Sequence, residues 1–347
     1  MSYLLTIDGG TTNTRYTLWD QTYEIIGTYR QDVGVRVSAV TGSTEAYRQN
    51  IAEGLQQILA QNQIHAGEIG AIYASGMITS SLGLQEVPHV PAPAGIEELA
   101  AAVRTVDDPK IFPGSIHLIP GVKNIVSGKT SDSPDGSGMD MMRGEETEVI
   151  ALLAELSNND FTGQDAGSML SPSRLIILPG SHNKFIWVSP EGKIELCRTT
   201  LSGELIDALS HHTILADAVE HTFAPSHFES KYLLAGAEAA DTKGLTAALF
   251  ETRIRRMFDG LSAPQAGTFL LGAVLEEDLK ACLGRSAPTN AVSLPNEIIV
   301  AGKDPLRSAI VYLLKKKNLS HVREYISESK PLAAYGALLL AREKGDF

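Results

Sequence analysis

The 347-residue sequence has only two cysteines, Cys197 and Cys282, and they lie far apart in the chain. Two isolated cysteines exclude a disulfide framework and the closely spaced ligand sets of zinc sites, and they fit a reducing compartment. No apolar run reaches the ~18 residues that a membrane-spanning helix needs. The first eight residues lack the basic and apolar segments of a signal peptide. We therefore expect a cytoplasmic protein with no membrane partner.

An excess of positive charge is also missing, since 29 Lys and Arg residues stand against 41 Asp and Glu residues. The resulting net charge of -12 disfavours binding to nucleic acid unless basic residues are segregated on one surface. The densest basic runs, residues 253–256 and 315–317, are short and lie in stretches with a helical pattern, which is typical of a solvated helix face. We therefore expect no nucleic-acid partner.

A pattern of strand, glycine turn, strand, strand occurs twice. The first copy covers residues 3–29, with its turn at residues 9–12, and the second covers residues 175–198, with its turn at residues 179–183. Helical spacing of apolar residues follows the first copy at 43–61 and returns at 143–156 and 331–344. The repetition predicts two α/β lobes, each built on a five-stranded mixed sheet. We place the N-terminal lobe at 1–157 and the C-terminal lobe at 158–330, with the C-terminal helix, 331–347, packing back on the first lobe.

The two turns are candidate phosphate-binding sites. In the first, Gly9 and Gly10 allow backbone N–H groups to approach phosphate oxygens, Thr11, Thr12 and Asn13 add donors, and Asp8 can hold a hydrated Mg²⁺. The second turn offers Gly180, Ser181 and His182. A plain hairpin turn is the alternative for each, and Asp-Gly, the pair that begins the first turn, is the commonest hairpin signal.

A candidate catalytic segment runs from Asp140 to Thr147. Phosphoryl transfer to an alcohol needs a carboxylate that accepts the hydroxyl proton, which Asp140 or Glu145 could do, and Arg143 could pair with an anionic group of a substrate. The alternative is that these carboxylates only cap a helix. Farther along, the apolar strand at 297–300 ends in small residues, and Gly302 could let an adenine ring approach the backbone, although an ordinary strand end is the simpler interpretation.

Taken together, these segments resemble the 2-dehydro-3-deoxygalactonokinase family of the sugar-kinase/Hsp70/actin superfamily. The resemblance spans nearly the whole chain. It is carried by Asp8-Gly9-Gly10-Thr11-Thr12-Asn13-Thr14-Arg15, Gly76-Met77-Ile78, the loop that begins at Glu86, Arg143-Gly144-Glu145-Glu146-Thr147, Pro179-Gly180-Ser181-His182-Asn183-Lys184 and Leu201-Ser202-Gly203-Glu204-Leu205.

The resemblance implies a two-lobed actin/hexokinase-like fold, a duplicated ribonuclease H-like architecture with a nucleotide cleft between the lobes. It also implies ATP, Mg²⁺ and phosphorylation of the 6-hydroxyl of 2-dehydro-3-deoxy-D-galactonate, a step of D-galactonate catabolism. By motif, Asp8 meets the metal, the two turns meet the phosphates, and Gly302 lies near the base of the nucleotide. The implied substrate residues are Arg15, Gly76, Met77 and Glu86.

Several points stay open at the level of sequence. Asp140 is the preferred catalytic base and Glu145 is the alternative. The substrate could be another sugar or sugar acid, or the chain could be a non-catalytic nucleotide sensor on the same fold. A homodimer is the oligomeric state that we consider.

Overall fold

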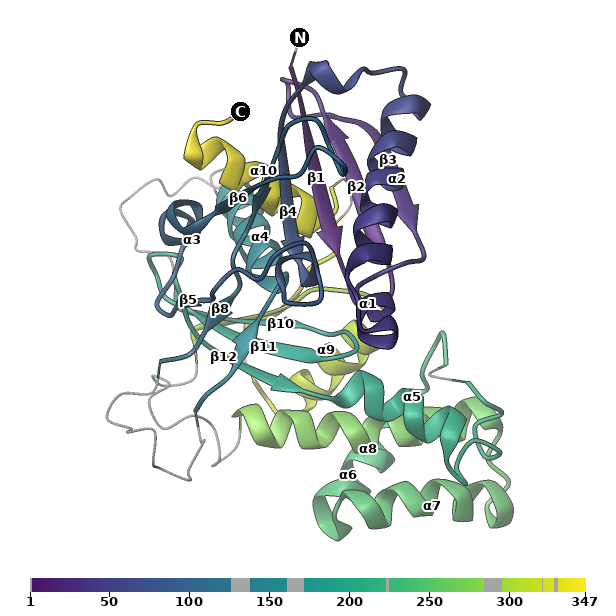
Figure 1. The fold of residues 1–347 in the computed structure, drawn as a ribbon. Helices are drawn as coiled ribbons and strands as arrows, with labels where there is room; N and C mark the ends of the chain where they lie inside the picture. Colours follow the sequence, from purple (N-terminus) through teal and green to yellow (C-terminus); the bar gives the residue numbers. More distant parts are fainter. Residues whose placement is uncertain are drawn as a thin grey trace, which may run out of the picture. The chain divides into compact units, whose positions relative to one another are not determined.

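The computed structural model describes residues 2–125, 138–160, 172–222, 225–283, 295–319, 321–327 and 330–347. Its contacts divide the chain into two compact units (Figure 1). The first unit consists of Met1–Ser171, Glu191–Glu195 and Ser327–Phe347, and the second of Pro172–Pro190 and Leu196–Ile326. The boundary predicted between residues 157 and 158 falls inside helix α4, which continues to Asp160. Residues 161–171, which follow this helix, lie outside the described residues.

The first unit is built on a six-stranded mixed sheet with the order β3-β2-β1-β4-β7-β6. Strands β1, β2 and β3 form an antiparallel meander, β1, β4 and β7 are parallel, and β6 pairs antiparallel with β7 at the edge. The strands are β1 (Tyr3–Gly9), β2 (Thr14–Trp19), β3 (Ile25–Gln31), β4 (Ile69–Gly76), β6 (Arg104–Asp107) and β7 (Ser115–Leu118). The expectation of five strands was wrong for this sheet, because the short and half-exposed β6 carries too few apolar residues to be recognised.

Helices cover both faces of this sheet. Leu5 and Ile7 of β1 pack into one hydrophobic cluster with Ile51 and Leu55 of α2. The alternate residues of β1 point to the opposite face, where Trp19 donates a hydrogen bond to Thr6 and packs against α10. On that face α10 contacts α4, α3, β1 and β4. The helices of the unit are α1 (Arg36–Thr41), α2 (Glu45–Gln61), α3 (Ile96–Ala102), α4 (Glu145–Asp160) and α10 (Leu332–Lys344), with short 3₁₀ helices η1 (Ala66–Glu68) and η2 (Met77–Thr79).

A small three-stranded sheet in the first unit has the order β5-β8-β9. Its strands have two residues each: β5 (Val90–Pro91), β8 (Val122–Lys123) and β9 (Met141–Met142). Strand β9 ends two residues before α4, with Arg143 and Gly144 between them. Helix α4 therefore begins at Glu145, two residues later than the sequence predicts, because Gly144 has a φ of +114° that no right-handed helix accepts.

The second unit repeats the arrangement of the first. Its sheet has the order β12-β11-β10-β13-β14, in which β10 pairs antiparallel with β11 and parallel with β13. Helix α8 is buried around most of its circumference and packs against α6, α7 and α5. The strands are β10 (Arg174–Leu178), β11 (Asn183–Val188), β12 (Ile194–Thr200), β13 (Glu297–Val300) and β14 (Val322–Glu324). The helices are α5 (Ser202–His212), α6 (Ser230–Lys243), α7 (Leu245–Phe258), α8 (Ala263–Leu283) and α9 (Leu306–Lys316).

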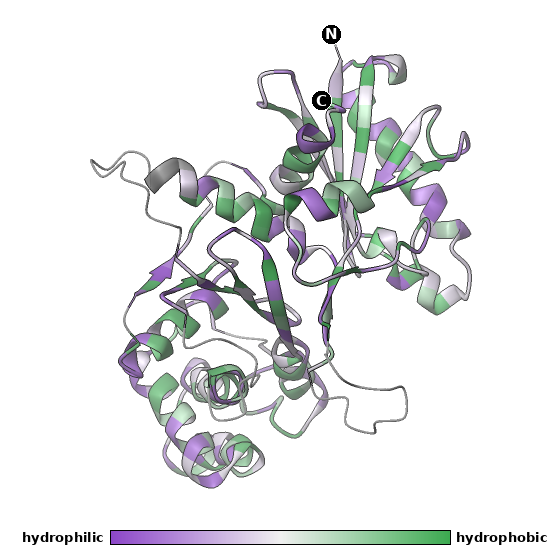
Figure 2. Cartoon of the chain, turned by 90° about the vertical axis from the view of Figure 1, so that its left-hand side faces the viewer, coloured by the Kyte–Doolittle hydropathy of each residue, from purple (hydrophilic) through white to green (hydrophobic). Residues whose placement is uncertain are grey.

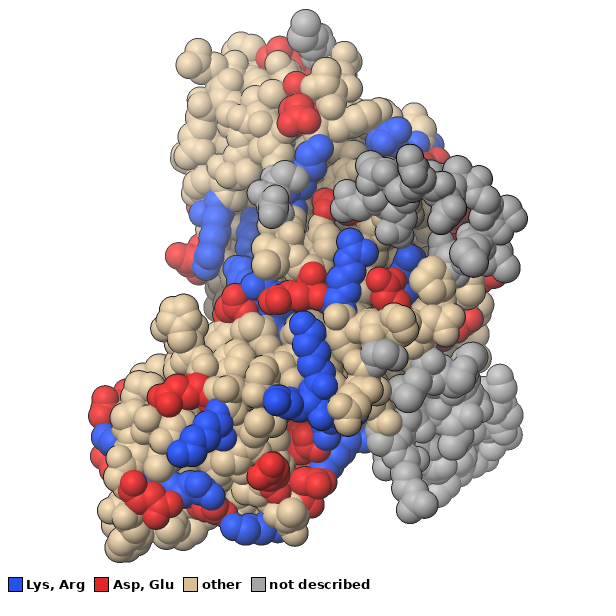
Figure 3. Space-filling model, turned by 180° about the vertical axis from the view of Figure 1, so that it is seen from behind, with Lys and Arg blue, Asp and Glu red and all other residues tan. Residues whose placement is uncertain are grey.

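Side-chain character follows this architecture. Hydrophobic residues gather along the sheet strands and on the inner sides of the helices (Figure 2). On the face drawn in Figure 3, lysine and arginine side chains are interspersed with acidic ones in each unit. Within the described ranges, the chain contains no helix of the length and apolar character needed to span a bilayer.

Candidate active site

Three glycines bring strands β1 and β4 and helix α4 into close contact in the first unit. Gly76, the last residue of β4, has a φ of +82°, and a Cβ at this position would lie 2.6 Å from the Gly9 carbonyl oxygen. A Cβ at Gly144 would lie 3.2 Å from the Gly76 Cα. A side chain at Gly76 would also approach Oδ1 of Asp8, at 3.5 Å. The absence of side chains at these glycines therefore sets the N-terminus of α4 against the carboxyl ends of β1 and β4.

Asp8 and Arg15 form an ion pair at this edge of the sheet. They face each other in the β1–β2 register, and Nη1 of Arg15 donates to Oδ2 of Asp8 at 2.7 Å. The Arg15 side chain is 43% exposed and that of Asp8 is 21% exposed. The pair is thus open to a ligand from solvent.

Backbone hydrogen bonds within the turn and from α1 hold the glycine turn that follows Asp8. Gly10 N donates to Asn13 O at 2.9 Å, and the Thr11 carbonyl accepts a hydrogen bond from Arg36 N at the start of α1, at 2.9 Å. Within the described part of the chain, the backbone N–H groups of Thr11, Thr12 and Asn13 donate to no protein group. Because Thr11 and Thr12 are exposed, these N–H groups can receive phosphate oxygens.

Two carboxylates at the start of α4 bind the backbone ahead of the helix. Glu145 accepts a hydrogen bond from Arg143 N at 3.0 Å. Both carboxylate oxygens of the fully buried Glu146 accept from Gly144 N, at 2.9 and 2.8 Å. Burial, and next the charge of Glu145, raise the pKa of Glu146 to about 8. Glu146 therefore orders the loop, while Glu145 keeps one carboxylate oxygen that does not cap the loop.

A third acid on this helix, Glu148, lies in the same electrostatic field. Burial raises its pKa to about 8, and the charges of Asp8, Glu145 and Glu146 add to the effect, while Arg15 opposes it. Glu148 therefore interacts with the acid of β1 as well as with the acids of its own helix.

Arg143 is engaged with a protein loop. Its Nη1 donates to the carbonyl and hydroxyl oxygens of Thr79 at 2.7 and 2.6 Å, and its Nη2 donates to Val87 O at 2.8 Å and contacts the His89 ring at 3.2 Å. Burial lowers the pKa of Arg143, and the charges of Glu146 and, to a smaller extent, of Glu86 oppose this shift. Arg143 thus ties the loop of residues 79–89 to the start of α4.

The other first-unit residues expected from the sequence lie around this edge at different depths. Asp140 is separated from α4 by strand β9, and its Oδ1 accepts a hydrogen bond from Met141 N at 2.7 Å. Met77 opens η2 directly after Gly76 and is half-buried, whereas Glu86 is exposed. Glu145 directly follows Gly144, the residue that approaches Gly76, whereas Asp140 lies on the other side of β9 in the sequence.

The turn of the second unit is supported by a buried carboxylate. Asn183 uses its Oδ1 to accept from Gly180 N at 3.0 Å and its Nδ2 to donate to Asp278 of α8 at 2.7 Å. Ser202, at the start of α5, donates to the other oxygen of Asp278 at 2.5 Å. Burial raises the pKa of Asp278, while its hydrogen bonds oppose this shift. The network fixes the turn to two helices.

The remaining predicted residues of the second unit lie beside this turn. Ser181 O accepts from Glu204 N at 3.0 Å, and the His182 ring contacts the Glu204 carboxylate at 3.0 Å. Gly302 has a φ of +96°, and a Cβ there would lie 3.2 Å from Pro179 O. The second unit therefore brings Gly180, Ser181, His182 and Gly302 together.

Comparison with known proteins places these features in a family. The family model of 2-keto-3-deoxy-galactonokinase matches residues 8–329. The chain belongs to the 2-keto-3-deoxy-galactonokinase family. The match includes both glycine turns and the start of α4, so the prediction of a sugar-acid phosphotransferase is confirmed.

Curated relatives carry the same description. A Rhizobium meliloti (strain 1021) protein named "Probable 2-dehydro-3-deoxygalactonokinase DgoK1" is 24% identical over 84% of this chain and 84% of its own length. The 2-dehydro-3-deoxygalactonokinase of Escherichia coli (strain K12) is 26% identical over 64% of this chain and 65% of its own length.

Solved structures support the fold. A crystal structure described as that of a 2-dehydro-3-deoxygalactonokinase protein from Sinorhizobium meliloti has a TM-score of 0.74 at 23% identity, over 98% of each chain. Component A of the (R)-2-hydroxyglutaryl-CoA dehydratase from Acidaminococcus fermentans has a TM-score of 0.50 at 12% identity, over 99% of each chain. The predicted actin/hexokinase-like fold class is confirmed for this kinase-family chain.

Sequence reasoning missed three polar residues of these sites. Asp278 lies 76 residues after Ser202 in the chain, and it directly follows Glu276 and Glu277 in α8, so nothing in the local sequence singles it out. Glu148 follows Glu145 by three residues, the spacing of one helix face. Ser75 precedes Gly76, and its buried hydroxyl gave no signal in sequence.

The acids of the first unit fit a hydrated cation better than a direct metal cage. Among the described residues, no three His, Cys, Asp or Glu side chains are grouped closely enough to hold a metal ion. Mg²⁺ keeps several waters and usually takes one or two protein carboxylates together with phosphates. Asp8, with further acids of α4 in its field, provides such a donor set.

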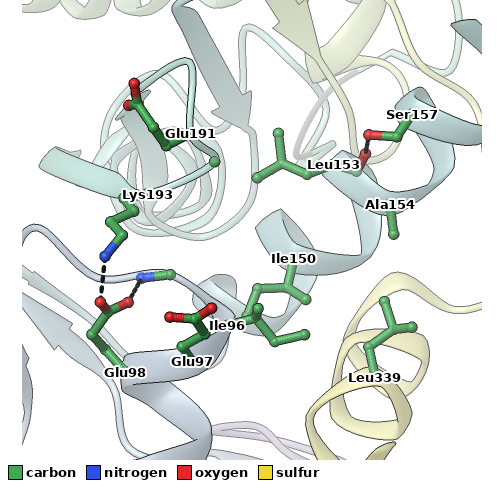
Figure 4. Close-up of a pocket in the computed structure, with 12 residues that line it drawn as sticks. Ile96, Glu97, Glu98, Ile150, Leu153, Ala154, Ser157, Glu191, Lys193 and Leu339 are labelled. Carbon is green, nitrogen blue, oxygen red and sulfur yellow. Dashed lines mark hydrogen bonds and ion pairs between the residues drawn. The ribbon is translucent and has the colours of Figure 1, made fainter. Parts of the chain in front are cut away.

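A separate cavity of about 470 Å³ opens in the first unit (Figure 4). Apolar side chains of α3, α4 and α10 form its wall, and Lys193 pairs with Glu98 at its rim. None of the site residues expected from the sequence lines it. The wall residues include Ile96, Ile150, Leu153, Ala154 and Leu339.

Proposed function

We propose that this kinase uses ATP to phosphorylate the 6-hydroxyl of 2-dehydro-3-deoxy-D-galactonate, as a step in D-galactonate catabolism. The observation that carries this proposal is the contact of Gly144 with Gly76, which sets the N-terminus of α4 against the strand ends that bear Asp8 and its glycine turn. A proton acceptor, an acid for a metal ion and free N–H donors thus occur at one edge of one sheet. The family membership of the chain supports the sugar acid.

Glu145 is the proton acceptor that the geometry favours over Asp140. Phosphoryl transfer is helped by a carboxylate within reach of the attacking hydroxyl. Glu145 is the first residue of α4, next to the Gly144–Gly76 contact, whereas Asp140 lies before β9 and bonds its own following amide. In this proposal Glu145 takes the proton of the 6-hydroxyl as the new P–O bond forms.

The glycine turns supply the phosphate-binding groups. In the first unit these are the N–H groups of Thr11, Thr12 and Asn13, made accessible by Gly9 and Gly10. In the second unit, Gly180, Ser181 and His182 do the same, and Gly302 leaves room beside them for the base. Mg²⁺, held through Asp8, would neutralise charge on the phosphates.

The substrate residues are proposed from exposure and charge. Arg15 keeps its guanidinium partly exposed next to Asp8 and is the candidate partner for the substrate carboxylate. Arg143 uses both terminal nitrogens within the protein, so we assign it the positioning of the loop that carries Glu86 and follows Met77.

The test is turnover by the purified protein with ATP, Mg²⁺ and a panel of acids. The panel holds 2-dehydro-3-deoxy-D-galactonate, its C4 epimer and a neutral sugar, and ADP release is measured. We expect the galactonate derivative to give the highest kcat/KM and NMR of the product to place the phosphate on C6. ADP release at background for every acid would contradict the proposal. Glu145→Gln should lose far more kcat than Asp140→Asn, and the opposite order would restore Asp140 as the base.

A further inference from the structure

Helix α7 of the second unit carries apolar side chains on both of its faces. Its inner face packs on α8 and α6, where Ala248 and Leu249 are buried in the hydrophobic clusters of that unit. Its outer face, at the lower edge of the unit in Figure 1, is the one on which a surface helix normally carries charged side chains. The residues exposed there are instead small or apolar and follow one another at helical spacing. We call them the α7 stripe: Thr246, Ala247, Phe250, Ile254, Met257 and Phe258.

The charged residues of α7 lie beside this stripe, and its three arginines have acidic partners within the second unit. The ion pairs are Arg253 with Asp217, Arg255 with Glu251 and Arg256 with Glu220. Local neutralisation of the arginines disfavours an anionic membrane or a nucleic acid as the occupant of the stripe. Because the stripe itself has no charged side chain, a protein surface can cover it without burying an unpaired charge.

The area of the α7 stripe suits a modest protein interface. Phe250 and Phe258 are 53% and 74% exposed. A phenylalanine can bury roughly 150–250 Å², so these two residues alone expose roughly 200–300 Å². With the neighbouring isoleucine and methionine, the patch is on the order of 400 Å², a size that is often functional on a single chain. Two such stripes and their flanking residues would bury about 1,000 Å², at the lower end for a specific dimer.

The α7 stripe is complementary to itself in the antiparallel direction. Small residues occupy its N-terminal end, 246–247, and large apolar residues occupy its C-terminal end, 257–258. A twofold axis near residue 252 places the small end of each helix against the large end of the other, and Phe250 beside Ile254. A parallel pair would instead bring the two large ends together and leave the two small ends apart.

We propose that the α7 stripe is a homodimer interface, in which the α7 helices of two copies of this chain pack antiparallel. The inference goes beyond the proposed function and does not depend on it. The charges at the ends of the helix favour the same direction. Lys243 is exposed just before α7 and Asp259 is exposed just after it, so antiparallel copies bring opposite charges near each other, whereas parallel copies bring like charges together.

The test is sedimentation velocity of the full chain over a range of protein concentrations. We expect a monomer–dimer equilibrium with a Kd in the micromolar range. Ile254→Glu places two like charges near the axis and should weaken dimerisation about tenfold or more. The matched control is Ile26→Glu on the edge strand β3, because Ile26 is 42% exposed and Ile254 is 39% exposed. The control should leave the Kd unchanged, and melting curves show that both variants are folded.

Cross-linking tests the direction of the helices. In an antiparallel pair, residue 247 of one copy lies beside residue 257 of the other. The double variant Ala247→Cys/Met257→Cys should therefore form a disulfide-linked dimer after oxidation, while each single variant should not. Within one copy the two positions are about 15 Å apart along the helix, too far for an internal disulfide. The two native cysteines are both buried.

Each alternative gives a distinct result. A wild-type protein that sediments as a monomer at every concentration overturns the inference, and so does a Kd that Ile254→Glu leaves unchanged or that Ile26→Glu weakens equally. Cross-linking of the single variants would show a parallel pair and overturn the proposed arrangement. A monomeric wild-type protein that cosediments with vesicles of phosphatidylcholine and phosphatidylserine, when Ile254→Glu does not, would assign the stripe to a membrane instead.

Discussion

Replacing Gly76 by alanine tests whether the glycine contact holds the active site together. Gly76 has φ +82° and ψ −156°, a conformation that is essentially restricted to glycine, so alanine should cost roughly 1–3 kcal/mol of backbone strain. Its Cβ would also lie 2.6 Å from the Gly9 carbonyl oxygen, and such overpacking costs about 1–3 kcal/mol more. The expected total is thus about 2–6 kcal/mol of unfolding free energy.

Gly244 provides a matched control for the steric part of this cost. It has φ +82° and ψ 157°, in the same glycine-favouring region as Gly76, but a Cβ there would meet nothing within 4 Å. Gly244→Ala should therefore show the backbone strain alone, about 1–3 kcal/mol. The difference between the two variants measures the collision with Gly9.

The assays are urea unfolding and steady-state kinetics. Gly76→Ala should lose more stability than Gly244→Ala by about 1–3 kcal/mol. Relief of the collision shifts Gly9 and the neighbouring Asp8, so kcat/KM should fall about 100-fold in Gly76→Ala and stay near the wild-type value in Gly244→Ala. Equal destabilisation by the two variants, together with normal kinetics in Gly76→Ala, would refute the proposed contact.

Three further predictions concern other sites. Burial lowers the pKa of His117, which stacks on Tyr73, so the folded state binds a proton at this ring less readily than the unfolded state does. The stability of the fold should therefore decrease as the pH drops below about 6.5. Melting temperatures measured between pH 7 and pH 5 should decrease less in His117→Gln than in the wild-type protein. Asp278→Asn should lower the free energy of unfolding in urea by about 1–3 kcal/mol, because Asn183 loses its buried carboxylate acceptor. The variant should also bind an ATP analogue more weakly. Unchanged binding of the analogue would show that this network does not support the nucleotide site. Arg143→Lys should raise the KM for the sugar acid more than it lowers kcat, because a lysine cannot bind the carbonyl groups of Thr79 and Val87 in the way the guanidinium does. A decrease in kcat with an unchanged KM would contradict a positioning role.

The sequence predicts the fold well where local pattern decides it. The strand–turn–strand segments at 3–29 and 175–198 are confirmed as β1 to β3 and β10 to β12, because alternating or continuous apolar residues end at glycine turns. The edge strand β6 and the two-residue strand β9 were not predicted. Both are too short to carry a period, and their pairing partners are chosen by tertiary contacts.

The sites are predictable only in part, for a related reason. A glycine turn that follows an apolar strand can be recognised from the local sequence, so Gly9, Gly10 and Gly180 could be predicted as site residues. The roles of Gly76 and Gly144 depend on a contact between segments about 70 residues apart, which no local pattern reports. In the same way, Arg143 resembles a substrate ligand in sequence, but in the structure its guanidinium binds the loop at Thr79 and Val87.

The duplicated scaffold explains why one chain can carry two different sets of site chemistry. In each unit a glycine with positive φ lies at the end of the parallel neighbour of the first strand. Gly76 ends β4 and lies against Gly9, and Gly302 follows β13 by two residues and lies against Pro179. What differs is the helix that packs beside this glycine or its turn: α4 approaches Gly76 in the first unit, and α8 bonds the turn residue Asn183 in the second. In the first unit the first two acids of α4, Glu145 and Glu146, accept hydrogen bonds from the backbone just ahead of the helix, and in our proposal Glu145 is also the proton acceptor. In the second unit both carboxylate oxygens of Asp278 on α8 accept hydrogen bonds, from Asn183 and Ser202, and these bonds hold the turn in place. The two units thus share a topology, while the acids of their supporting helices make different contacts.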